Sequence, residues 1–72
     1  MKNKVSIKND LVKEKRKLDE KIMNLNNFIR STEFVHLQNN AKYLLHQQSE
    51  HMTKYSLVLR DRIVDITKQE TE

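Results

Sequence analysis

The chain has 72 residues and a formal net charge of +4, and it contains no glycine, proline or cysteine. Glycine supplies the positive φ angles of tight turns and phosphate-binding loops, and proline breaks helices. The composition therefore excludes a small β fold, a glycine-rich nucleotide loop and a disulfide framework, and it predicts a single all-α domain over residues 1–72. We also expect a cytoplasmic protein, because a chain without cysteine has no disulfide framework, and the sequence shows neither a signal peptide nor an apolar run of about 20 residues.

The positive charge is concentrated in the first third of the chain. Residues 1–21 contain eight lysines and arginines against four acids, whereas residues 22–72 are balanced. Such a patch attracts polyanions, and the candidate basic face consists of Lys13, Lys15, Arg16 and Lys17. The alternative is a solvated helix face, partly neutralised by ion pairs at i,i+4 spacing between Lys15 and Asp19 and between Arg16 and Glu20.

The first predicted helix covers about residues 10–30. Its apolar positions recur at the spacings of a coiled-coil seam, at Leu11, Leu18, Ile22, Leu25 and Ile29. Asn9 or Ser6 is the expected N-cap, because both side chains accept hydrogen bonds from the first free amides of a helix.

A short polar bend is predicted at about residues 31–39, with Thr32 as the N-cap of a turn that carries Phe34 and Leu37. The second helix is predicted at about residues 40–68. Its stripe passes through Ala41, Leu44, Gln48, Met52, Tyr55, Leu59, either Arg62 or Ile63, and Ile66.

Two matched stripes and a short connection predict an antiparallel two-helix hairpin with a kinked connection. A lone hairpin buries little apolar surface, because it has no third layer to cover its flanks. We therefore expect the hairpins to assemble into a helical-bundle homo-oligomer.

The pattern of residues along both helices resembles a known family. In the first half the matching residues are Glu14-Lys15, residues 18–22, Leu25, Phe28-Ile29, Ser31, Phe34 and Leu37. In the second half they are Leu44-Leu45, Gln48, Met52, Tyr55, Leu59 and Arg62-Ile63. This pattern is similar to small phage-encoded helical hairpins of crAss-like and other tailed phages. The similarity covers most of residues 11–64, although this chain is rich in lysine where members are often acidic.

The resemblance implies a phage origin more than a mechanism, because most members of that family have no assigned activity. Small non-enzymatic phage proteins of this sort commonly act against the host. By analogy, one route is the capture of cyclic-nucleotide or ADP-ribose-derived immune signals in pockets between subunits. The chain would then work in the cytoplasm of an infected bacterium.

Polar side chains on the second helix form the main candidate binding site. Gln48, His51, Tyr55 and Arg62 follow one another at spacings of three, four and seven residues. A tyrosine ring can stack on a base, and arginine binds phosphate bidentately, with Arg60 or Lys54 as further phosphate contacts. The alternative is that Gln48 and His51 fix the register between helices while Tyr55 belongs to the core.

Metal binding and catalysis are not expected. His46 and Glu50 share a helix face and His51 or His36 could approach them, but this falls short of a four-ligand zinc site. Ser49, Glu50 and His51 are consecutive, so a helix points them about 100° apart and they cannot form a catalytic triad. No cofactor is expected.

Together with the resemblance to phage-encoded hairpins, the sequence favours a non-enzymatic phage protein that sequesters a small nucleotide signal at subunit interfaces. The alternative is an inhibitor that binds a host protein or nucleic acid through the basic face of the first helix. Nucleic-acid binding is the weaker form of this alternative, because the recognised motifs are absent.

Overall fold

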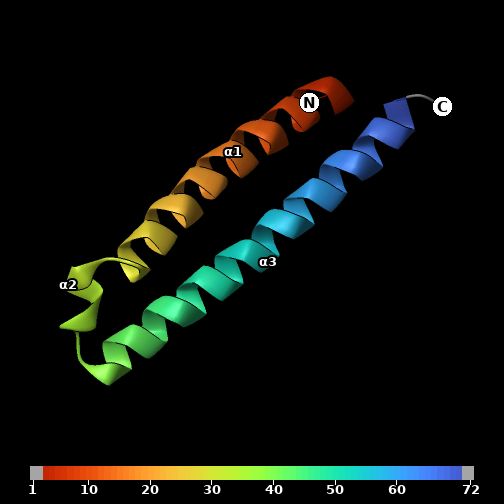
Figure 1. Cartoon of the computed structure of the whole chain (residues 1–72). Coiled ribbons are helices and arrows are strands. Elements are labelled where there is room, and N and C mark those ends of the chain that lie inside the picture. The colour runs from red at the N-terminus through yellow and green to blue at the C-terminus, as the bar shows by residue number, and fades with distance from the viewer. Residues whose placement is uncertain (1–2, 71–72) are drawn as a thin grey trace.

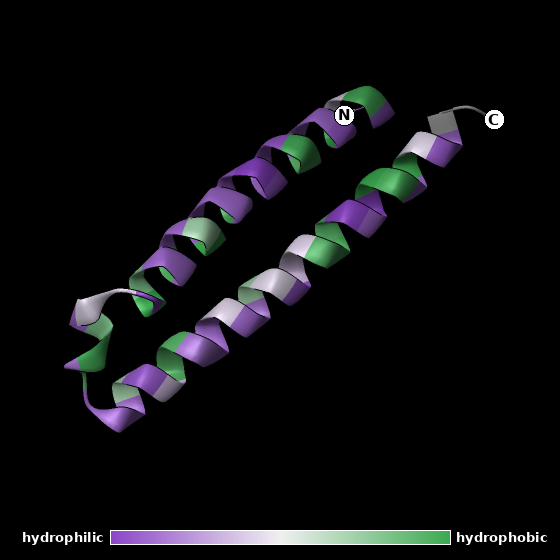
Figure 2. Ribbon diagram, viewed as in Figure 1, coloured by the Kyte–Doolittle hydropathy of each residue, from purple (hydrophilic) through white to green (hydrophobic). Residues whose placement is uncertain are grey.

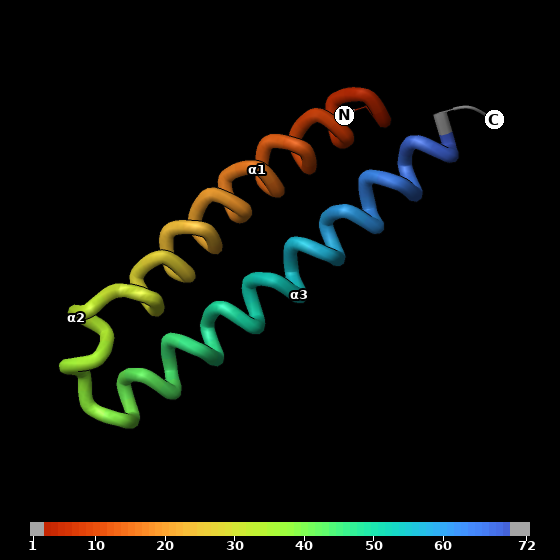
Figure 3. Tube along the Cα trace, viewed as in Figure 1, coloured from red at the N-terminus to blue at the C-terminus, as the bar shows by residue number. Residues whose placement is uncertain are grey.

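The structure is a computed structural model that describes residues 3–70. Two long helices, α1 (Lys4–Ile29) and α3 (Asn39–Glu70), lie side by side and antiparallel, with the one-turn helix α2 (Thr32–Val35) between them (Figure 1). The molecule is a rod of 53 × 19 × 14 Å, with α2 at one end and both termini at the other (Figure 3). The predicted all-α hairpin is confirmed.

Helix α1 begins earlier than the sequence indicated. Asn3 is its N-cap, and the side-chain oxygen of Asn3 accepts a hydrogen bond of 2.8 Å from the backbone amide of Ser6. The prediction that Asn9 or Ser6 would cap the helix is therefore wrong. The half-buried Ile7 lies in this additional stretch and prolongs the apolar stripe toward the N-terminus.

The connection between the long helices is held by one serine and two aromatic rings. Ser31, not the predicted Thr32, is the N-cap of α2, and its hydroxyl donates to the carbonyl of Phe28 at 2.6 Å. The rings of Phe28 and Phe34 pack edge to face with their centroids 6.4 Å apart. The chain therefore reverses without glycine or proline, and no described residue has a positive φ angle.

The core is a single seam between α1 and α3. Leu11, Leu59 and Ile66 are its buried apolar residues, and Leu59 is fully buried. Figure 2 shows that hydrophobic residues recur along two otherwise largely hydrophilic helices. Along α3 the seam has the alternating 3-4 spacing of a coiled coil, through Leu45, Ser49, Met52, Ser56, Leu59, Ile63 and Ile66.

The seam of α3 differs from the predicted stripe. Leu44, Gln48, Tyr55 and Arg62 are all exposed. Two small hydroxyl residues occupy the seam instead, because each donates a hydrogen bond to a polar side chain of α1. Ser49 donates to Asn26 at 2.6 Å, and the buried Ser56 donates to Asp19.

The hairpin leaves many apolar side chains uncovered on its flanks. The exposed large hydrophobic residues of the two long helices are Val5, Val12 and Met23 on α1, and Tyr43, Leu44, Tyr55, Leu57, Val58 and Val64 on α3. Within the described residues, neither long helix is apolar enough over a sufficient length to cross a membrane.

Candidate functional site

Four of the predicted ligand-binding residues share one exposed strip of α3. With 100° of rotation per residue, Gln48, His51, Tyr55 and Arg62 fall within about 60° of one another. All four side chains are exposed, and they lie beside the seam rather than in it. We call these four residues the α3 edge. The exposed Val58 lies next to this strip, about 20° beyond His51, and adds an apolar residue beside it.

Tyr55 is the best-positioned side chain of the α3 edge. Its phenol donates a hydrogen bond to the carboxylate of Glu14 on α1, although 45% of the residue remains exposed. This hydrogen bond raises the pKa of Tyr55 above its ordinary value, and the positive charge of Arg62 partly opposes the rise. The contact joins the ring of Tyr55 on α3 to α1, and Arg62 lies about two helical turns further along the same strip.

The other two predicted phosphate contacts lie away from this strip. Lys54 pairs with Glu50 at 3.2 Å on the outer face of α3, and Arg60 bonds to Asp61 at 3.1 Å. Helical rotation places Arg60 about 160° from Arg62, on the other side of the seam. The structure therefore brings Gln48, His51, Tyr55 and Arg62 together and leaves Lys54 and Arg60 out.

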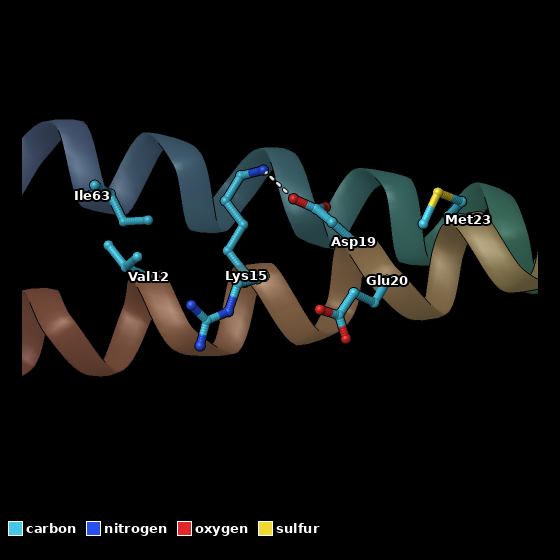
Figure 4. A pocket seen from close by; sticks show the side chains of 7 residues that line it. Val12, Lys15, Asp19, Glu20, Met23 and Ile63 are labelled. Atoms are coloured by element: carbon cyan, nitrogen blue, oxygen red, sulfur yellow. Dashed lines mark hydrogen bonds and ion pairs between the residues drawn. The ribbon is translucent and has the colours of Figure 1, made fainter.

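A second feature, which the sequence analysis missed, is a groove of about 400 Å³ on the opposite edge of the hairpin. Its α1 lining includes Val12 and Met23 at the two ends, and α3 contributes Ile63. Figure 4 shows Val12 and Ile63 pointing toward each other and Lys15 reaching toward Asp19. The sequence does contain a signal for this groove: Val12 and Met23 are apolar, although each lies one position after a seam residue of α1.

Asp19 is the polar centre of this groove. Lys15 contacts its carboxylate at 2.8 Å and Ser56 donates to its other oxygen. These two hydrogen bonds lower the pKa of Asp19 below its ordinary value, with Lys15 as the larger cause. The carboxylate therefore stays charged at the helix interface and joins α1 to α3.

The predicted basic face is divided by this arrangement. Lys15 is half-buried and turned to the groove, whereas Lys13, Arg16 and Lys17 are exposed. The predicted Lys15–Asp19 ion pair is confirmed. Among residues 3–70 the Arg16 side chain makes no ion pair with Glu20, so this predicted pair is wrong. We call Val12, Arg16, Asp19 and Met23 the α1 edge.

The histidines considered as metal ligands have other surroundings. His46 packs its ring edge to face against Phe34, with the centroids 5.5 Å apart, and Glu50 is paired with Lys54. His36 is the C-cap of α2. Over the described part of the chain, no three histidine or acidic side chains come together as a metal site requires.

Comparison with known proteins bears on the whole hairpin. The sequence profile of the Sequestin family matches residues 6–65, which span both long helices and the turn. The chain belongs to the Sequestin family. The name of the family denotes sequestration, which fits a protein that binds a partner. No curated protein and no solved structure matches the chain.

Proposed function

We propose that this Sequestin is a non-enzymatic phage protein that captures a small nucleotide immune signal on its α3 edge. The observation that carries the proposal is the exposed ring of Tyr55, which donates a hydrogen bond to Glu14 and shares the α3 edge with Arg62. An aromatic face with a guanidinium about two helical turns further along the same strip suits a base and its phosphate. Membership of the Sequestin family supports a sequestering role.

Each residue of the α3 edge has a distinct role in this proposal. Tyr55 stacks on the base, Arg62 donates paired hydrogen bonds to phosphate, and His51 and Gln48 offer further donors along the strip. One edge covers a ligand on one side only. Closure therefore comes from a second hairpin that brings its own copies of these residues, an arrangement that suits a cyclic, pseudo-symmetric nucleotide.

The counter-defence part of the proposal rests on the resemblance to phage-encoded hairpins. A sequestering protein lowers the free concentration of a signal without chemistry, so it needs affinity and abundance rather than a catalytic group. The protein would act in the cytoplasm of the infected bacterium. It would be its own main partner, with no cofactor.

Isothermal titration of the folded protein against cyclic dinucleotides, cyclic trinucleotides and cyclic ADP-ribose isomers tests this proposal. Because base stacking contributes about 1–3 kcal/mol, we expect Tyr55→Ala to weaken binding of the active compound by roughly ten-fold or more. Arg62→Ala should have a similar effect, because it removes charge-assisted hydrogen bonds. Neither variant should change the mass of the assembly.

Matched controls are available on the same helix. Tyr43 is an exposed tyrosine outside the α3 edge, and Arg60 lies on the other side of the seam. Tyr43→Ala and Arg60→Ala should therefore leave the affinity unchanged. Absence of heat with every compound would overturn the nucleotide proposal, and equal losses in the control variants would overturn the assignment to the α3 edge.

A second candidate function has one observation in its favour. Lys13 and Lys17 are exposed on the outer face of α1, where a polyanionic or acidic host partner could reach them. Charge reversal at both residues should then abolish partner binding, and binding to nucleic acid should fall steeply with salt. Nucleotide binding that survives this double reversal would favour the first function.

A further inference from the structure

The α1 edge belongs to a longer stripe whose order is self-complementary. Beside the seam of α1, side chains recur at alternating spacings of four and three residues, at Val5, Asn9, Val12, Arg16, Asp19, Met23, Asn26 and Arg30. This spacing is that of a second coiled-coil seam on the same helix. Within α3, only Ile63 contributes to the groove along this stripe.

From this order we infer that the α1 edge is the contact between two copies of this chain, with their α1 helices antiparallel about a two-fold axis near residues 17 and 18. In such a pair, residues equidistant from the axis face each other. Val12 then faces Met23 of the second copy, and Arg16 faces Asp19 of the second copy. Asn9 likewise meets Asn26, so the three central pairs join apolar, charged and amide groups to suitable partners, whereas at the two ends of the stripe Val5 faces Arg30.

The exposure of these residues fits such a contact. Val12 is 44% exposed and Met23 is 58% exposed, although both line a groove that their own α3 only partly covers. Within residues 3–70, no ion pair or side-chain hydrogen bond engages Arg16 or Glu20. In Figure 4, Glu20 points away from α3. An arginine of a second copy would therefore meet two acids, Asp19 and Glu20.

The charge order also selects the direction of the pair. In a parallel pair each residue would face its own copy, so Arg16 would face Arg16 and Asp19 would face Asp19. Like charges placed opposite each other are destabilising, whereas the antiparallel pair contains two Arg16–Asp19 contacts. The occupant of the groove is therefore an antiparallel second copy rather than an unrelated apolar peptide, which would leave Arg16 without an acid.

This inference shares one requirement with the proposed function, because both need copies of the chain to associate. On α1, Glu14 and Val12 are separated by about 200° of helical rotation, so the α1 and α3 edges lie on opposite sides of the seam. A dimer formed through α1 leaves both α3 edges open. They can then meet the α3 edges of further copies around a ligand.

Cysteine cross-linking tests the register, since the chain has no cysteine of its own. In the double variant Val12→Cys/Met23→Cys, the two cysteines are about 16 Å apart along one helix, too far for an internal disulfide. We expect mild oxidation to convert this variant to a covalent dimer. Val12→Cys alone should not cross-link with itself, whereas a mixture of Val12→Cys and Met23→Cys chains should form a mixed dimer.

The control is Val64→Cys on α3, where the native valine is 46% exposed and lies outside the groove. Equal cross-linking of Val64→Cys would show indiscriminate collision and overturn the inference. Cross-linking of Val12→Cys with itself would show a parallel pair and overturn it as well. The inference would also be overturned if Val12→Cys/Met23→Cys kept its helical circular dichroism but gave no covalent dimer.

Light scattering on a cysteine-free variant provides an independent measurement. Met23→Glu should remain helical and dissociate at a concentration at least about ten-fold higher than the parent, because a charge would replace an apolar contact at two places. An unchanged mass would overturn the α1 contact. Nucleotide binding in the same variant separates the two proposals: binding that survives loss of the dimer shows that the α3 edge works without this contact.

Discussion

The two edges of the hairpin are built beside the same seam but have different chemistry. The α3 edge presents a tyrosine ring hydrogen-bonded to a carboxylate of the other helix, with an arginine about two helical turns further along. The α1 edge presents two exposed apolar residues around charges of both signs. The first arrangement suits a small aromatic anion, and the second suits another copy of the chain.

This difference shows how few residues a thin helical protein needs to create two surfaces. A helix rotates 100° per residue, so positions two residues apart point to opposite flanks. Glu14 supports the α3 edge, and Val12 belongs to the α1 edge. The seam between α1 and α3 positions both edges, so each edge can have its own chemistry independently of the other. Changes in the seam should therefore affect both edges, and changes beside it only one.

Leu59→Ala should have the largest effect and should disrupt both edges together. Leu59 is fully buried, and truncation of a buried leucine costs about 2–5 kcal/mol. In a hairpin with a single seam, this loss should unfold a large fraction of the chain. Urea unfolding followed by circular dichroism would measure the change.

Leu57→Ala is the matched control for this experiment, because Leu57 is 46% exposed on the same helix. It should change the stability by no more than about 0.5 kcal/mol. Equal losses in the two variants would mean that Leu59 is not the centre of the seam, and the placement of both edges would then have to be revised.

Ser56→Ala should have a smaller effect that depends on pH. Removal of its hydrogen bond to Asp19 should cost about 1 kcal/mol at neutral pH. Asp19 has a lowered pKa in the folded protein, so its contribution is present above its unfolded pKa and is lost as the pH falls through the folded value. Without Ser56 the pKa should rise toward normal, and the stability should fall less steeply in acid.

Ser49→Ala separates the charge effect from the loss of a hydroxyl. Ser49 also donates across the seam, but its acceptor is the neutral Asn26. This variant should lose a similar stability at neutral pH while keeping the acid dependence of the parent. Urea unfolding at neutral and acidic pH would compare the two, and identical pH profiles in all three proteins would contradict the role given to Asp19.

Ser49 and Ser56 mark the boundary between what the sequence predicts about the fold and what it does not. The all-α fold, the long helices and the seam of α1 follow from composition and from the spacing of leucine and isoleucine. On α3 the 3-4 spacing is compatible with two neighbouring strips, and the prediction assigned Gln48 and Tyr55 to the seam. Only the acceptors Asn26 and Asp19 on α1 make serine suitable there, and contacts between helices are not visible in a local pattern.

The candidate site was predictable to a similar degree. Helical periodicity correctly grouped Gln48, His51, Tyr55 and Arg62, because residues on one face are determined by rotation alone. It did not reveal that Glu14 holds Tyr55, since the two residues are far apart in sequence. It also missed the α1 groove, because the positions of Val12 and Met23 were compared only with the seam between α1 and α3. Their place in a second stripe on α1 was not considered.

Glu14→Gln should have the smallest effect on folding but a specific effect on the α3 edge. The carboxylate accepts the hydrogen bond of the Tyr55 phenol, and its negative charge opposes formation of a phenolate. Its replacement by an amide should lower the pKa of Tyr55 toward the ordinary value of 10.0. Stability should change little, because this contact lies at the surface, where water screens it.

The ultraviolet absorbance of tyrosinate during an alkaline titration would measure this shift, with Tyr55→Phe used to assign the signal. Because the raised pKa makes the folded state favour the protonated phenol, the contribution of Tyr55 to stability is lost as the pH rises through its folded pKa. If Glu14→Gln leaves the Tyr55 titration unchanged, the carboxylate does not hold the ring, and the α3 edge loses its fixed aromatic face.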